Sequence, residues 1–99
     1  MKLITSKRDS DKTKTLIKHS IDNGIPILTL SAEDAASIRL EAITSFGREV
    51  DIITPNDLAQ ITYTGEILVD DLEKSFTTLL EDYVRSSSFT IAAATVKEE

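Results

Sequence analysis

Two short stretches of this sequence carry side chains that could do chemistry. Lys12 and Thr13 place an ammonium group beside a hydroxyl in the first quarter of the chain, where residues 1–24 carry a local charge of +3. This stretch could meet an anion. Asp70 and Asp71 place two carboxylates directly after an apolar run. They therefore lie at the carboxyl end of a predicted strand, where open α/β sheets bind their ligands.

The remaining residue types narrow the chemistry. The chain has no cysteine, which excludes a thiol nucleophile, a disulfide framework and a Cys-ligated metal site. The lone His19 lies in a polar helical stretch without a partner motif, so we expect it to be solvated. Arg39 and Arg48 could clamp a phosphate of another chain, but such residues more often form surface ion pairs.

The elements that must position these residues alternate between strand and helix. Strands are predicted at residues 2–5, 25–30, 50–54, 66–70 and 89–96. Helices are predicted at residues 13–23, 32–46 and 72–83, with a polar loop over residues 6–11, a short helical piece around Leu58 and an ambiguous stretch at residues 61–64. This order predicts an α/β fold, a three-layer α/β/α sandwich with a mostly parallel sheet of about five strands.

Helix boundaries have clear signals. Ser31 is a good N-cap, and Asp34 three residues later resembles the acid of a capping box. Gly24 and Gly47 are placed to end the first two helices.

Residues 2–13 resemble the phosphate-binding loop of P-loop NTPases, in which a strand runs through G-x-x-x-x-G-K-[ST] into a helix. In that family, backbone N–H groups and the lysine bind phosphates while the hydroxyl holds magnesium. The resemblance implies these roles for Lys12 and Thr13. The positions that would line the loop are Ser6, Ser10, Asp11, Lys12 and Thr13.

Later segments resemble the same family in the same order. Residues 67–71 are similar to the Walker B element, which implies that Asp70 orients a magnesium shell, together with Thr13, and that Asp71 can activate water. Residues 89–95 resemble the following strand, whose polar end senses the γ-phosphate, with Thr95 as the candidate. The intervening segments are similar to those of RecA-type and helicase-like motors. The resemblance therefore covers nearly all of residues 1–99, as one truncated P-loop-like domain.

Departures from the family pattern bear on activity. Ser6 and Asp11 stand where the motif has its two glycines. A carboxylate about 4 Å from a phosphate charge, at an effective dielectric near 20, costs roughly 4 kcal/mol. The resemblance covers no second lobe, so we also expect no arginine finger from this domain. We therefore expect no catalysis, and no cofactor beyond weak ATP and magnesium.

A plainer interpretation stays open for each motif. Lys12 and Thr13 could be exposed residues of a first helical turn, and Asp70 and Asp71 a strand end and a helix N-cap.

The net charge of the chain narrows the kinds of partner that it can bind. The chain has a net charge of -6, with -4 in residues 25–65 and -5 in residues 66–99. We expect no direct nucleic-acid binding, no membrane segment and a cytoplasmic location.

The favoured hypothesis is a non-catalytic binding or inhibitory module on a larger nucleic-acid-processing or defence protein, similar to small phage motor fragments. Alternatives are a working ATP- and magnesium-binding domain and an acidic decoy that mimics nucleic acid. Self-association through an exposed sheet edge is also expected.

Overall fold

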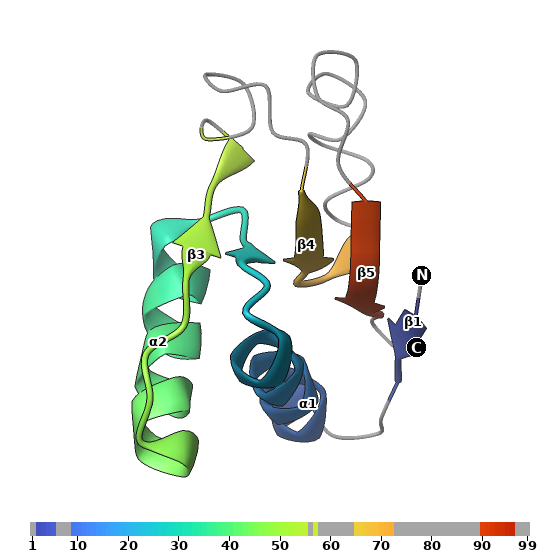
Figure 1. Cartoon of the computed structure of the whole chain (residues 1–99). Coiled ribbons are helices and arrows are strands. Elements are labelled where there is room, and N and C mark those ends of the chain that lie inside the picture. The colour runs from blue at the N-terminus through green and yellow to red at the C-terminus, as the bar shows by residue number, and fades with distance from the viewer. Residues whose placement is uncertain (1, 6–8, 56, 58–64, 73–89, 97–99) are drawn as a thin grey trace.

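The computed structural model describes residues 2–5, 9–55, 57, 65–72 and 90–96 (Figure 1). Five strands form one sheet in the order β1-β5-β4-β2-β3, and every neighbouring pair is parallel. The α/β fold with a five-stranded parallel sheet is therefore confirmed. The strands are β1 (Lys2–Ile4), β2 (Ile27–Leu28), β3 (Ile52–Ile53), β4 (Glu66–Val69) and β5 (Thr90–Thr95).

Two helices, α1 (Asp9–Asn23) and α2 (Ala32–Phe46), follow the first two strands. At the start of α2, the Ser31 hydroxyl accepts a hydrogen bond from the Asp34 backbone N–H at 3.1 Å. Gly24 and Gly47 end the helices with φ values of 66° and 65°, where a side chain would be strained. The predicted caps of both helices are confirmed.

The first helix begins four residues earlier than predicted. The expected loop over residues 6–11 is wrong for Asp9, Ser10 and Asp11, which belong to α1. Acidic residues favour the first turn of a helix because its free N–H groups carry partial positive charge. The carbonyl oxygen of Asp11 also accepts a hydrogen bond from the Thr15 hydroxyl at 2.9 Å, within the helix.

Apolar residues form one cluster on each face of the sheet. In β4, Leu68 packs into a cluster with both helices, while Ile67 and Val69 pack into a second cluster on the opposite face. All three side chains are fully buried. Because a sheet buried on both faces needs cover on both, this arrangement is compatible with a three-layer sandwich. Leu72, just after β4, packs against the second cluster.

The chain runs across the sheet in two directions. The steps from β1 to β2 and from β2 to β3 both move toward the β3 edge, and α1 and α2 both pack on the same face. The chain then returns to β4 and β5, which fill the gap beside β1. Parallel pairing therefore brings the carboxyl ends of all five strands to one edge, called here the carboxyl edge.

Some predictions lie outside the described residues. These are the helix over residues 73–83, the helical piece around Leu58 and the stretch at residues 61–64. Just before Leu58, Pro55 and Asp57 are helical. The backbone N–H and hydroxyl of Thr54 both donate to the Asp57 carboxylate, at 2.7 and 3.1 Å. A search of the described helices found none long and apolar enough to cross a membrane.

Candidate functional site

Three of the predicted site residues meet at the carboxyl edge, between β4 and β5. The Thr95 hydroxyl accepts a hydrogen bond from the Asp71 backbone N–H at 2.7 Å and donates one to the Asp70 carboxylate at 3.2 Å. Thr95 is 5% exposed, while both aspartates are half-buried. The hydroxyl thus joins two segments that lie about a quarter of the chain apart.

An irregularity in the sheet produces this meeting. Ile67 pairs with Ile91, but Leu68 pairs with Ala93, so Ala92 is an extra residue in β5. Ala92 and Ala93 consequently both pack on the helix-covered face. Without the extra residue, Thr95 would shift by one position relative to Asp70 and point to the opposite face.

Lys12 reaches the same edge from α1. Its side chain is 6% exposed, and its ammonium Nζ donates to the backbone carbonyl of Val96 at 2.9 Å. Val96 follows Thr95 directly, and its own N–H bonds to the carbonyl of Ile4 at 3.2 Å. The alternative interpretation of Lys12 as an exposed first-turn residue is wrong, because this side chain is buried and bonds to the end of β5.

The other loop candidates are less closely connected to this network. Asp11 is exposed on α1, and Thr13 is half-buried. Ser10 lies in the first turn of α1, and Ser6 lies outside the described residues. The start of α1 therefore exposes the Asp11 carboxylate where the family motif has a glycine, and this carboxylate competes with any anion for the positive end of the helix.

No magnesium site can be assigned from the described side chains. Among them, no three His, Cys, Asp or Glu residues cluster closely enough to hold a metal ion. The predicted pair of Thr13 and Asp70 therefore stays a prediction.

Asp71 has an unusual backbone conformation. Its φ is 59°, in the left-handed region that side chains other than those of Gly, Asn and Asp rarely adopt. The hydrogen bond from its N–H to Thr95 holds this conformation. Such strain costs on the order of 1 kcal/mol and tends to occur at functional sites.

Thr29 is a further polar residue at this edge, which the sequence analysis missed. It is fully buried, and its hydroxyl has no hydrogen-bond partner among the described residues. Thr29 directly follows β2, and Leu28 pairs with Val69, so Thr29 is in register with Asp70. A hydroxyl inside the otherwise apolar run of residues 25–30 was the signal that could have found it.

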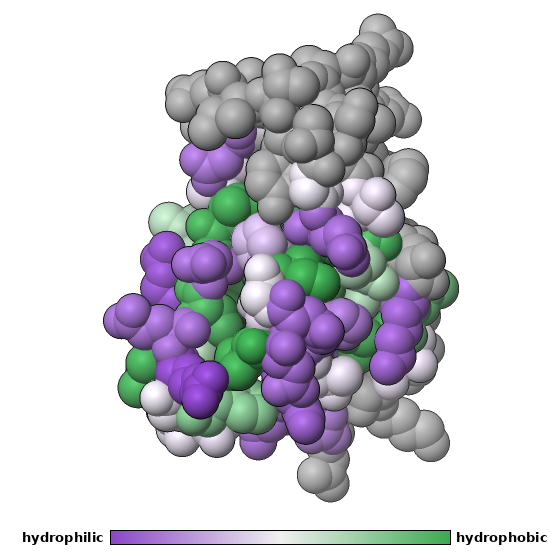
Figure 2. Space-filling model, in the orientation of Figure 1, coloured by the Kyte–Doolittle hydropathy of each residue, from purple (hydrophilic) through white to green (hydrophobic). Residues whose placement is uncertain are grey.

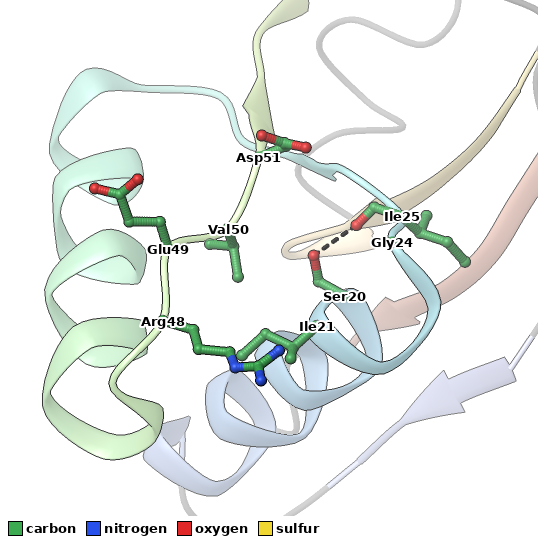
Figure 3. A pocket seen from close by; sticks show the side chains of 8 residues that line it. All are labelled: Ser20, Ile21, Gly24, Ile25, Arg48, Glu49, Val50 and Asp51. Atoms are coloured by element: carbon green, nitrogen blue, oxygen red, sulfur yellow. Dashed lines mark hydrogen bonds between the residues drawn. The ribbon is translucent and has the colours of Figure 1, made fainter.

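A hollow of the described surface lies away from these residues. Its volume is about 170 Å³, and it lies between the carboxyl end of α1 and the segment before β3, at the opposite edge of the sheet (Figure 3). The Ser20 hydroxyl on its wall donates to the Ile25 carbonyl at 2.6 Å. Arg48, Glu49 and Asp51 also line it. None of the residues predicted to bind a nucleotide lies in it.

Comparison of the chain with protein-family models, with curated proteins and with solved structures gave no match in any of the three.

Proposed function

We propose that this chain is a non-catalytic relative of the P-loop NTPase core that acts by binding a larger nucleic-acid-processing or defence protein. One observation supports the first half of this proposal most directly. Two side chains that would contact the phosphates of a nucleotide contact the protein: Lys12 bonds to Val96, and Thr95 bonds to both Asp70 and Asp71.

Nucleotide binding would have to break this network. A hydrogen bond to a charged group contributes about 1.5–3 kcal/mol, so moving the ammonium of Lys12 from the Val96 carbonyl to a phosphate has a cost before any gain. Asp11 adds electrostatic repulsion of roughly 4 kcal/mol if a phosphate charge lies about 4 Å away. Together these terms oppose ATP binding by several orders of magnitude.

The charge distribution supports a protein partner. Residues 25–65 carry -4 and residues 66–99 carry -5. Their exposed acids include Glu33, Glu49, Asp51, Asp57 and Glu66. Such a surface repels nucleic acid and attracts a basic protein surface, speeding association at low salt.

Calorimetric titration with ATP and magnesium tests the loss of nucleotide binding. We expect no binding by the wild type up to millimolar nucleotide and measurable binding by Asp11→Asn, which removes the charge but keeps the size. Asp22→Asn is the matched control, because it makes the same change near the other end of α1. Micromolar binding by the wild type that is lost in Lys12→Ala would instead support the working ATP-binding domain.

The exposed acids also favour a second candidate, the nucleic-acid-mimicking decoy. A competition assay would measure whether the protein displaces labelled duplex DNA from a basic, non-specific DNA-packaging protein. A decoy should displace the DNA, and Glu49→Lys with Asp51→Lys should weaken it at least tenfold. If the wild type displaces no DNA at low salt, the decoy hypothesis fails while the non-catalytic binding module stands.

A further inference from the structure

Helix α2 exposes large apolar side chains on its outer surface. Leu40 is 69% exposed and Ile43 is 50% exposed, and their spacing of three residues places them side by side on one face of the helix. Over α2, on the left of Figure 2, apolar side chains lie among charged ones. Adjacent exposed apolar side chains on a small domain indicate a contact surface.

A groove lies directly beside these side chains. It has a volume of about 190 Å³ and is lined by Arg39 and Ile43 of α2 and by Glu49 and Val50 of the segment that runs alongside the helix. Figure 3 shows this segment and the side chains of Glu49 and Val50. Cavities of roughly 150 Å³ hold benzene, so the groove can take one branched aliphatic side chain.

Opposite charges flank the groove. Arg39 and Glu49 are both exposed, and within the described part of the chain neither forms an ion pair. The patch therefore combines a protruding leucine, a groove that can receive it, one cation and one anion. A two-fold symmetric interface requires this kind of self-complementarity, because the same patch must supply both halves of each contact.

We propose that a second copy of this chain docks on this surface to form a symmetric dimer. Leu40 of each copy enters the groove of the other copy, and Arg39 of each copy pairs with Glu49 of the other. This contact is separate from pairing along the exposed β1 edge, and it does not depend on the proposed function.

Sedimentation equilibrium from micromolar to millimolar protein tests the proposal. We expect the wild type to dimerise and Leu40→Glu to raise the dimer dissociation constant at least tenfold. Leu3→Glu is the matched control, since Leu3 is 52% exposed but lies on β1. Thermal unfolding followed by circular dichroism would verify that each variant is folded. A wild type that stays monomeric at millimolar concentration, or a dimer that dissociates on Leu3→Glu but not on Leu40→Glu, would overturn the proposal.

A charge exchange tests the symmetry itself. For Arg39→Glu and for Glu49→Arg, we expect the dimer dissociation constant to rise at least fivefold over that of the wild type. In a dimer of either variant, positions 39 and 49 have the same charge in both of the symmetric contacts. An equal mixture of these two variants should recover the affinity, since both pairs in the mixed dimer are again opposite in sign. If the mixture is no stronger than its components, the assigned contact is wrong.

Discussion

The carboxyl edge of the sheet and the hollow near Ser20, at the amino ends of the strands, are held by different kinds of hydrogen bond. At the carboxyl edge, Lys12 bonds to a carbonyl 84 positions away, and Thr95 bonds to a carboxylate 25 positions away. At the opposite edge, Ser20 bonds to a carbonyl only five positions away. Hydrogen bonds between segments far apart in the sequence form only when the whole domain is folded. The bond of Ser20 to Ile25 needs only the end of one helix.

Two further features distinguish the carboxyl edge from the hollow near Ser20. The carboxyl edge also contains the strained Asp71 and the buried hydroxyl of Thr29 that has no partner among the described residues. Strain and unsatisfied buried polar groups have a free-energy cost, and both occur at this edge, which makes it the candidate site of the described part of the chain. The hollow near Ser20 has neither a strained non-glycine residue nor an unpaired buried hydroxyl among its described residues.

The largest expected effect is that of Thr95→Val. This change removes one hydrogen bond of the Asp71 N–H and one of the Asp70 carboxylate, so we expect the free energy of unfolding to fall by about 2 kcal/mol. Thr90→Val is the matched control at the exposed start of the same strand, with an expected change within about 0.5 kcal/mol. Urea denaturation measures both, and equal midpoints for the two variants would show that Thr95 does not join the two strands.

The backbone strain at Asp71 is tested by comparing Asp71→Gly with Asp71→Ala. Both variants lose the carboxylate, so their difference isolates the left-handed conformation. We expect the free energy of unfolding of the glycine variant to be higher by about 1 kcal/mol, because a positive φ is sterically unfavourable for alanine. Equal denaturation midpoints would mean that Asp71 is not held in that conformation in solution.

Thr29→Val should raise stability, in contrast to the other substitutions at this edge. Replacing a buried hydroxyl that lacks a partner with a methyl group of similar size should increase the free energy of unfolding by about 1 kcal/mol. Thr44→Val, on the exposed surface of α2, should leave it nearly unchanged. A loss of stability in Thr29→Val would instead show that the hydroxyl has a partner in solution, such as a bound water or ion.

The smallest effect is expected at the opposite edge. Ser20→Ala removes one hydrogen bond to Ile25 but places a better helix former in α1, so we expect a net loss of about 0.5 kcal/mol. Thermal denaturation of both variants would compare the loss of stability in Ser20→Ala with that in Thr95→Val. A loss as large as that of Thr95→Val would remove the distinction between the two edges.

Much of the fold could be predicted from the sequence because its signals are local. The capping of α2 by Ser31 follows from which side chains can bond to free N–H groups, and the ends at Gly24 and Gly47 follow from which residue tolerates positive φ. The start of α1 was missed because three polar residues suit a loop and a first helical turn equally well.

The candidate site was predictable only as a set of residue types. The local pattern of residues predicts that Lys12 lies near the start of a helix, that Asp70 and Asp71 follow an apolar strand, and that Thr95 ends another strand. The folded sheet was needed to show that β5 lies between β1 and β4, and that the extra residue Ala92 turns Thr95 toward Asp70. Strand order and register depend on packing between distant segments, and apolar strands of similar composition carry no local signal that selects one neighbour over another.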